Sequence, residues 1–396
     1  MALPSGLERN LLGAPTASHQ KVEIYSGVAR LSRTVWASEV RRTGSLPEVA
    51  VMICHPTANF LGHYALPGLA ERGLAAIGFT TRYVGNDTSL IMENCLLDMA
   101  AMVRYLYERG YAKVVLVGNS GGASIVPYYQ AQARRPTVSA PPGGGPDLTT
   151  AGLVPVDAVV FLNAHPSRAR LSTEWLDPAI VDEHQPFERD PSLDMFDPAN
   201  RAPFSEAFVT RYREAQRARN RRISAWAEAQ LAALSGPSHR PAGLDDLAFV
   251  VPGTGADLRF LDGTIDPSDR QIGVTLWGPP EVANHLPAGI SRVTTLRAWL
   301  NQWSLDHTNG DSLRWLPEID VPVGIVLGTA DPTVMPAMAA QMHDAASAAP
   351  RRDLKMISGA THYFEGQPEL LDQALDHIAG FIGTALGGPA PAGSPR

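Results

Sequence analysis

Residues 113–133, KVVLVGNSGGASIVPYYQAQA, are the most informative part of the sequence for the fold. It begins with a continuous apolar run, Val114 to Val117, which is typical of a strand buried on both faces. The run leads directly into GNSGG, residues 118–122, and a helical pattern follows. The pattern G-x-S-x-G between a strand and a helix predicts a tight turn that exposes the hydroxyl of Ser120. The first and last glycines of the motif are small enough for the strand and the helix to approach each other closely there.

On both sides of this turn, short β-branched runs alternate with longer amphipathic stretches. Such alternation predicts the α/β class, with a mostly parallel central sheet flanked by helices. The further strands are expected at residues 21–31, 34–41, 49–54, 74–80, 156–164, 321–328 and 353–359, and helices at 60–72, 88–109, 335–348 and 367–385.

One region of about 150 residues interrupts the alternation. It contains few buried-strand runs and one long helical pattern at 204–234. An insertion of this length between two strands is too long for a simple loop, so it predicts a mainly helical cap domain. The two ends of the chain are rich in Pro, Gly and Ala, which is typical of loosely packed termini. The expected division is 21–165 with 316–385 as the core, 166–315 as the cap, and 1–20 and 386–396 as loosely packed ends.

Composition limits the classes of partner. The net charge of -7 lacks the basic excess that nucleic-acid binding requires. No apolar run reaches the roughly 18 residues of a membrane-spanning helix, and the first twenty residues lack a signal-peptide pattern. Cys54 and Cys95 lie in apolar stretches and are expected to be buried free thiols. We therefore expect a cytoplasmic protein without metal or cofactor, whose partner is a small, partly apolar substrate rather than nucleic acid or a membrane; a homodimer is left open.

The strand, turn and helix around GNSGG resemble the α/β-hydrolase superfamily. The resemblance covers roughly residues 45–165 and 316–385 and implies an α/β-hydrolase fold with Ser120 as nucleophile. The chain order of the family, serine then acid then histidine, directs attention to the strands downstream. A glycine-rich structural turn is the alternative interpretation of the motif.

A serine hydroxyl becomes nucleophilic when a base takes its proton, and that base is normally a histidine held by a carboxylate. Asp331 follows the apolar run at 321–328, and His362 follows the next expected strand, in a loop before a helix. Both therefore lie at the carboxyl edge of the sheet, where sites in such folds form. They match the acid and histidine positions of the family. An ordinary turn residue and a surface-loop histidine are the alternatives.

An oxyanion intermediate requires two hydrogen-bond donors. One is expected to be the backbone N–H of Gly121, directly after the nucleophile. The other is expected from HPTANF, residues 55–60, which resembles the family's His-Gly-x or His-Pro-x loop. Pro56 has no N–H, so we favour Thr57, with Ala58 as second choice. Three further residues are placed beside the substrate: His55, which is expected to brace this loop, Asn119 and Phe60.

A serine at this turn argues against the family's dehalogenases and epoxide hydrolases, which use an aspartate, and against dienelactone-type hydrolysis through cysteine. What remains is hydrolysis of a carboxylic ester, lactone, thioester or amide through an acyl-enzyme, with a carboxylesterase as the main interpretation. Hydrolysis of a carbon–carbon bond in a ring-cleavage product is an alternative, because Gly-Asn-Ser also resembles that subfamily. A catalytically inactive binding protein with the same fold is another.

Two features of the expected cap have a structural and a functional interpretation. The arginines between 211 and 222 either bind an anionic substrate or, as we favour, form a solvated face paired with carboxylates. A set of aromatic residues either lines an apolar pocket or packs the core of the cap: Trp226, Trp277, Trp299, Trp303 and Phe260.

Overall fold

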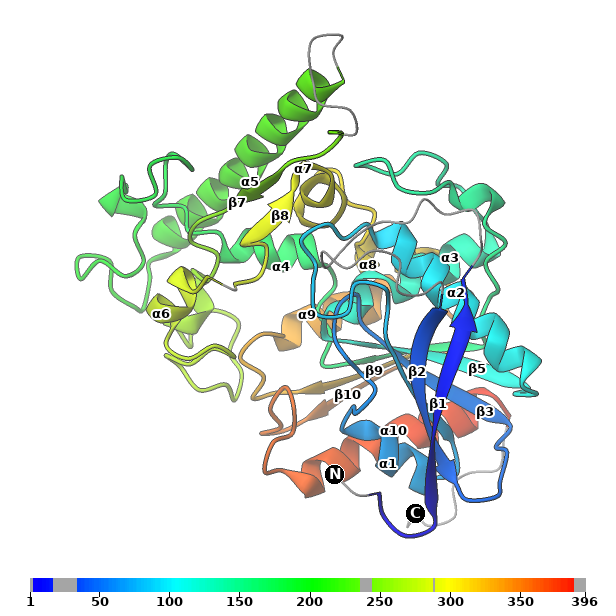
Figure 1. The fold of residues 1–396 in the computed structure, drawn as a ribbon. Helices are drawn as coiled ribbons and strands as arrows, with labels where there is room; N and C mark the ends of the chain where they lie inside the picture. The colour runs from blue at the N-terminus through cyan, green and yellow to red at the C-terminus, as the bar shows by residue number, and fades with distance from the viewer. Residues whose placement is uncertain (1–2, 17–33, 236–243, 288, 388–396) are drawn as a thin grey trace.

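The computed structural model describes residues 3–16, 34–235, 244–287 and 289–387 (Figure 1). Within these residues, eight strands form a central sheet in the order β1-β2-β4-β3-β5-β6-β9-β10. Strand β2 pairs antiparallel with both of its neighbours, and every pair from β4 to β10 is parallel. The strands are β1 (Leu7–Pro15), β2 (Thr34–Arg42), β3 (Val49–Cys54), β4 (Ala75–Phe79), β5 (Lys113–Asn119), β6 (Ala158–Leu162), β9 (Val323–Gly328) and β10 (Arg352–Ile357).

Helices cover both faces of the sheet. Successive residues of β5 point to opposite faces: Val115 and Val117 pack with the helices of one layer, while Val114 and Leu116 pack with those of the other. The strand is therefore buried on both sides, as its continuous apolar run predicts. One layer holds α1 (Ala65–Glu71) and α10 (Pro368–Ala385), and the other holds α2 (Met92–Glu108), α3 (Val126–Arg134) and α9 (Pro336–Ala345).

This architecture confirms the predicted fold class, an α/β-hydrolase fold with a mostly parallel central sheet flanked by helices. Cys54 and Cys95 are buried free thiols, as expected. None of the described helices combines the length and the apolar composition needed to cross a bilayer.

The N-terminus differs from the prediction. Residues 7–15 form β1, which pairs with β2 from Leu7 opposite Arg42 to Pro15 opposite Thr34. Only Leu12 and Ala14 of this strand are fully buried. Because an edge strand places few apolar side chains in the core, its sequence carries little of the alternation that predicts strands. The expectation of a loosely packed end over 1–20 is wrong for these residues, and the strand expected at 21–31 lies outside the described residues.

The helix expected at 60–72 begins only at Ala65. Before it, the chain makes a turn in which the N–H of His63 donates to the carbonyl of Phe60 at 3.1 Å. Strand β4 passes so close to this turn that a Cβ on Gly78 would lie 1.9 Å from the Phe60 carbonyl oxygen. Packing against a distant strand, which local periodicity does not encode, thus shortens the helix.

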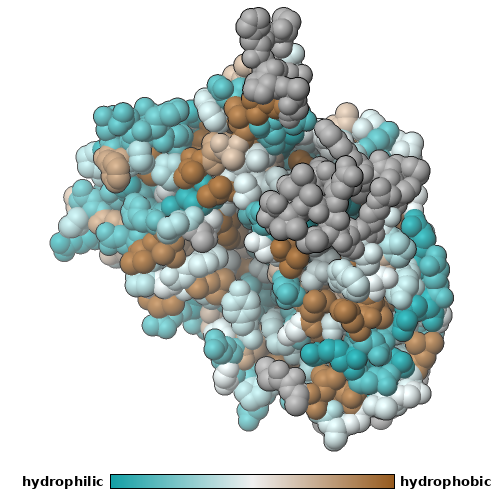
Figure 2. Space-filling model, viewed as in Figure 1, coloured by the Kyte–Doolittle hydropathy of each residue, from teal (hydrophilic) through white to brown (hydrophobic). Residues whose placement is uncertain are grey.

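Residues 166–315, the inserted segment, lie between β6 and β9 in the chain. They contain α5 (Glu206–Leu234), which confirms the long helix expected at 204–234, and an antiparallel pair of short strands, β7 (Ala248–Val250) and β8 (Val293–Thr295). In Figure 1, α5 and these strands extend away from the central sheet. The face drawn in Figure 2 is hollowed between this part and the half that holds the sheet. The other helices of the segment are α4 (Arg168–Trp175), α6 (Pro280–His285), α7 (Leu296–Ala298) and α8 (Ser312–Trp315).

Candidate active site

The turn after β5 holds Ser120 in a strained backbone conformation. Its φ is 52°, in the left-handed region that residues other than glycine seldom adopt. The short 3₁₀-helix η1 (Ser120–Ser124) begins at this residue and leads into α3. A Cβ on Gly122 would lie 2.0 Å from the carbonyl oxygen of Cys54 at the end of β3, so only glycine fits there. The strand–turn–helix geometry predicted for the motif is therefore present.

The expected acid and base meet at the same edge of the sheet. Asp331 follows β9, His362 follows β10, and His362 Nδ1 donates to Asp331 Oδ2 at 2.5 Å. The other carboxylate oxygen accepts the backbone N–H groups of Thr333 and Val334 at 2.7 and 3.0 Å. Both side chains are buried, with 0% of Asp331 and 2% of His362 exposed. The carboxylate is thus fixed in place, and it leaves His362 Nε2 as the basic nitrogen of the ring.

Ser120 and His362 line one cavity of about 260 Å³, called here the catalytic pocket. Within the part of the chain that the structure describes, no hydrogen bond joins the Ser120 hydroxyl to His362. Such bonds are often long in ligand-free sites and tighten only when a substrate binds. The pairing of Ser120 with His362 stays a prediction, and their shared cavity is the observation that favours it.

The loop at 55–58 differs from the prediction in its donors. The N–H groups of Thr57 and Ala58 both donate to His55 Nδ1, at 3.0 and 2.9 Å. His55 thus braces the loop, while the N–H expected to face the oxyanion, that of Thr57, already has an acceptor. The same holds for the second choice, Ala58. This engagement depends on a side-chain ring closing back on its own loop, which the residue order does not reveal.

The two bonds to His55 also fix its proton. With Nδ1 acting as acceptor, the neutral ring carries its hydrogen on Nε2. Burial, together with the nearby Arg168, holds the pKa of His55 well below its usual value, so the ring stays neutral. Its Nε2 lies 2.9 Å from the point where a Cβ on Gly121 would stand. An imidazole N–H therefore lies beside Gly121, where the sequence predicts a backbone donor.

Asn119 and Phe60 line the catalytic pocket, but Asn119 has partners of its own. Its amide donates to the Leu162 carbonyl of β6 at 2.7 Å, and its oxygen faces His63 Nε2 at 3.4 Å. Burial lowers the pKa of His63 to about 4, so this ring is neutral and donates to Asn119. Asn119 thus fastens the end of β5, and its expected contact with substrate stays a prediction.

Arg168, at the start of α4, is the main pocket residue that the sequence analysis did not single out. Its side chain is 8% exposed, and its Nη2 lies 2.5 Å from Asp87 Oδ2. The guanidinium lies over the ring of Trp303, 4.4 Å from its centroid. The position of Arg168 shortly after the strand expected at 156–164 was the available signal, because residues at that end of a strand meet the site.

Most of the apolar lining of the catalytic pocket comes from the inserted segment, and Ala58, Phe60 and Tyr363 add to it from outside that segment. Trp277 and Trp303 line the pocket, and Trp303 also belongs to the buried core of the segment, which contains Trp299 and has Trp226 packed against it. Both interpretations of the aromatic set are therefore correct for part of it. The apolar lining from this segment is Leu171, Leu276, Trp277, Ile290 and Trp303.

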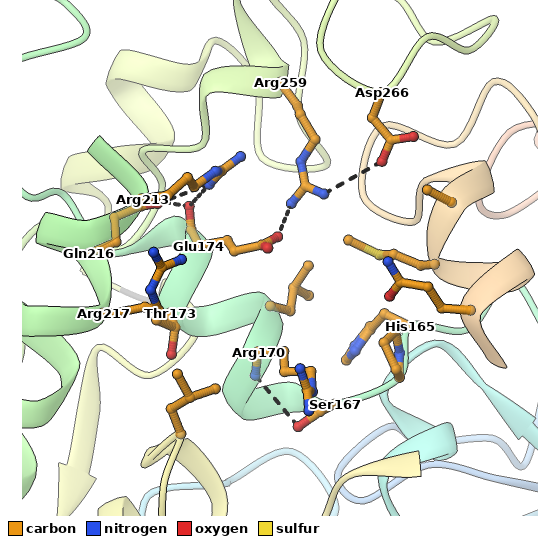
Figure 3. Close-up of a pocket in the computed structure, with 16 residues that line it drawn as sticks. His165, Ser167, Arg170, Thr173, Glu174, Arg213, Gln216, Arg217, Arg259 and Asp266 are labelled. Atoms are coloured by element: carbon orange, nitrogen blue, oxygen red, sulfur yellow. Dashed lines mark hydrogen bonds and ion pairs between the residues drawn. The ribbon is translucent and has the colours of Figure 1, made fainter. Parts of the chain in front are cut away.

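A second cavity, also of about 260 Å³, adjoins the first and shares His165 and Leu171 with it (Figure 3). It is lined by four arginines: Arg170, Arg213, Arg217 and Arg259. Figure 3 shows Arg259 between Glu174 and Asp266, with Arg213 on the neighbouring helix. We call it the arginine cavity.

Most arginines of α5 have carboxylate partners, as the structural interpretation expects, but Arg219 and Arg213 do not lie on a solvated face. Arg219, buried, pairs with Glu183; Arg213 pairs with Asp257 at 2.8 Å. Arg221 and Arg222 pair with Asp306 and Glu183. Within the described residues, no three His, Cys, Asp or Glu side chains are grouped so that they could hold a metal ion.

The sheet order and the strained serine between β5 and α3 define the class: the chain has the fold of the α/β-hydrolase superfamily. No family model matches the chain, and no curated protein matches its sequence. Among solved structures it is similar to DcsB in complex with a substrate analogue, at 14% identity and a TM-score of 0.47, over 96% of this chain and all of DcsB. An esterase from Pyrococcus furiosus has 11% identity and a TM-score of 0.45, over 96% of this chain and 92% of that one. An esterase of the bacterial hormone-sensitive lipase family has 13% identity and a TM-score of 0.45, over 98% and 87%.

Proposed function

We propose that this protein is a serine hydrolase that cleaves a carboxylic ester-type bond through an acyl-enzyme. Ser120 is the nucleophile, His362 the base and Asp331 the acid that orients the base. The observation that carries the proposal is the 2.5 Å bond from His362 Nδ1 to Asp331. It leaves Nε2 as the basic nitrogen of a ring that lines the same pocket as Ser120. A pure binding protein has no need of such a pair.

In the reaction, His362 Nε2 takes the proton of Ser120 Oγ as the oxygen attacks the acyl carbon. Asp331 stabilises the resulting imidazolium, which then gives its proton to the leaving alkoxide. Water, deprotonated by the same imidazole, hydrolyses the acyl-enzyme and regenerates Ser120. The inserted segment acts as the cap in this scheme, because its apolar side chains cover the pocket and exclude bulk water.

Two donors stabilise the oxyanion in this proposal. The first is the N–H of Gly121, which lies in the first turn of η1, where backbone N–H groups have no intrahelical acceptor. The second is the Nε2–H of His55 in place of the Thr57 N–H, because the latter is bonded to His55 Nδ1. The neutral ring gives a donor that needs no change of protonation during the reaction.

The test is labelling with a fluorophosphonate, which reacts only with an activated serine. We expect the reagent to modify the wild-type protein at one peptide, the one that contains Ser120, and to leave Ser120→Ala unmodified. His362→Ala should react far more slowly, because its serine has lost its base. Ser45→Ala, at a half-buried serine in the turn after β2, is the matched control and should label like wild type. Absence of labelling in the folded wild-type protein, or labelling at another serine, contradicts the proposal.

The bond type is tested on a panel of p-nitrophenyl esters of graded chain length, lactones, a thioester and a vinylogous diketone. Turnover of the esters supports the carboxylesterase interpretation. Preferential cleavage of the diketone identifies the carbon–carbon hydrolase that the Gly-Asn-Ser motif leaves as the alternative.

A further inference from the structure

Arg168 carries a cation into the catalytic pocket. Its side chain is 8% exposed and lines the same cavity as Ser120 and His362. A Cβ on Gly121 would lie 3.5 Å from its Nη1. Since consecutive Cα atoms are about 3.8 Å apart, this nitrogen lies beside the residue next to the nucleophile. The cation is therefore at the place where an acyl group bound to Ser120 would lie.

The hydrogen-bonding capacity of this guanidinium is only partly used. Its Nη2 donates to Asp87, and within the described residues its Nε is buried without a hydrogen-bond partner. No bond is made by Nη1 to any described residue. A buried donor without an acceptor is costly, and guanidinium N–H groups match the two oxygens of a carboxylate in geometry. The unused donors thus fit an anionic ligand.

The surroundings of Arg168 favour such a ligand further. Stacking on Trp303 fixes the plane of the guanidinium, so that its donors are oriented before a ligand arrives. Asp87 is the one carboxylate beside it in the pocket lining, and its side chain is 32% exposed, so solvent screens that charge. Burial and Arg168 lower the pKa values of the neighbouring His55 and His165, so both rings are neutral. They therefore do not neutralise the charge of Arg168 as a carboxylate would.

We propose that the substrate is an ester whose acyl group bears a carboxylate, and that Arg168 binds that carboxylate. This inference rests on the proposed function, because it assigns the substrate class of the same site. The closeness of Nη1 to Gly121 favours a short acyl chain, such as that of succinate or glutarate. The apolar lining from the inserted segment would then contact the alcohol part.

The experiment compares two esters that differ in one charged group: mono-p-nitrophenyl glutarate and p-nitrophenyl pentanoate. We expect the wild-type protein to prefer the glutarate half-ester in kcat/KM. In Arg168→Met the ratio of the two kcat/KM values should fall by about 30-fold, as expected when a charge-assisted bond is lost. Arg168→Lys keeps the charge but not the planar guanidinium, so its ratio should lie between those of the wild-type protein and Arg168→Met. Arg221→Met, which removes an arginine paired with Asp306 outside both cavities, is the control.

A ratio unchanged by Arg168→Met overturns the inference, as does an equal loss for both esters, which would make Arg168 a general electrostatic or structural residue. Inhibition of the wild-type protein gives a measurement that does not depend on the variant folding. Glutarate should compete with p-nitrophenyl pentanoate at least about tenfold better than pentanoate does, since only glutarate has a second carboxylate for Arg168. Equal inhibition by the two acids contradicts the proposal.

The two proposals fail in different ways. If fluorophosphonate labels Ser120 but the ester ratio and the inhibition show no preference for the second carboxylate, the substrate class is wrong and the hydrolase stands. If Ser120 does not label and neither ester is cleaved, the hydrolase is wrong. Binding of glutarate to Ser120→Ala, measured by calorimetry with Arg168→Met as reference, then still tests the carboxylate site.

Discussion

The two adjoining cavities have similar volumes, but their arginines are paired differently. In the arginine cavity, Arg170 pairs with Asp311, Arg213 with Asp257, and Arg259 with both Asp257 and Glu174. In the catalytic pocket, Arg168 has Asp87 alone and keeps a buried Nε without a partner. A buried arginine that pairs with two carboxylates, such as Arg259, holds the fold together, whereas one with a buried unused donor can hold a ligand.

The cavities also differ in the elements that build them. The reactive groups of the catalytic pocket follow β3, β5, β9 and β10, so one sheet edge brings them together. The arginine cavity is lined mainly by α4, α5 and the η4 turn (Leu258–Phe260) of the inserted segment, with α9 on one side. Substitutions in the first should therefore change chemistry, and those in the second should change stability.

The largest effect is expected from the catalytic pocket. Ser120→Ala or His362→Ala should lower kcat by about 10⁴-fold or more, and Asp331→Asn somewhat less, because the three groups act as a unit. The measurement is steady-state turnover of a p-nitrophenyl ester, with thermal unfolding of each variant to show that the fold is kept. Near-normal turnover by His362→Ala would show that another group is the base.

In the arginine cavity the expected loss is one of stability. Arg259 is buried and lies 2.5 Å from Asp257, so Arg259→Met leaves a buried carboxylate with one cation fewer. Breaking such a pair costs about 3–5 kcal/mol of unfolding free energy. Urea denaturation measures it, and Arg221→Met, whose ion pair with Asp306 is exposed and screened by solvent, should cost far less. Equal stabilities of the two variants would contradict the structural role of the cavity.

Acid should separate the two regions by the pH at which each loses stability. Burial lowers the pKa of His63, beside the catalytic pocket, from 6.5 to about 4. The ring is neutral in the folded protein, whereas in the unfolded chain it binds a proton below pH 6.5. The neutral ring therefore contributes fully to the free energy of unfolding above pH 6.5, and this contribution is lost as the pH falls towards 4. Between pH 6.5 and 4, one such histidine lowers the free energy of unfolding by roughly 3 kcal/mol.

The measurement is the unfolding free energy between pH 7 and 4 for wild type and His63→Gln. The variant should lose less stability over this interval, since a glutamine does not titrate.

In the arginine cavity, Asp257 is buried, which opposes ionisation, yet Arg213 and Arg259 lower its pKa below 3.8. The contribution of Asp257 to the free energy of unfolding is therefore present above pH 3.8 and is lost only below that pH. Equal slopes for wild type and His63→Gln above pH 4 would show that His63 does not carry the effect.

The sequence predicted those positions in the fold that depend on local signals. The β5 run, the glycines around Ser120 and the positions of Asp331 and His362 after buried strands are each readable within a few residues, and the structure brings them to one sheet edge. The fold class followed from the same alternation of strands and helices.

What the sequence did not predict depends on contacts between distant or folded-back residues. The engagement of the Thr57 N–H follows from the position of the His55 ring, and the stacking of Arg168 on Trp303 joins residues far apart in the chain. The edge strand at residues 7–15 buries too few side chains to show a pattern. In each case the deciding interaction is tertiary.

The smallest effect is expected at Arg217, the one exposed arginine among those lining the arginine cavity that has no ion pair with any described residue. Without a buried partner to lose, Arg217→Met should keep the unfolding free energy within about 0.5 kcal/mol of wild type. Its kcat/KM ratio for the glutarate half-ester over the pentanoate ester should equal the wild-type ratio. The first quantity comes from the urea denaturation described for Arg259, and the second comes from the ester assays described for Arg168. A fall in that ratio would mean that the arginine cavity also attracts the substrate carboxylate, and the distinction between a structural and a ligand-binding set of arginines would no longer hold.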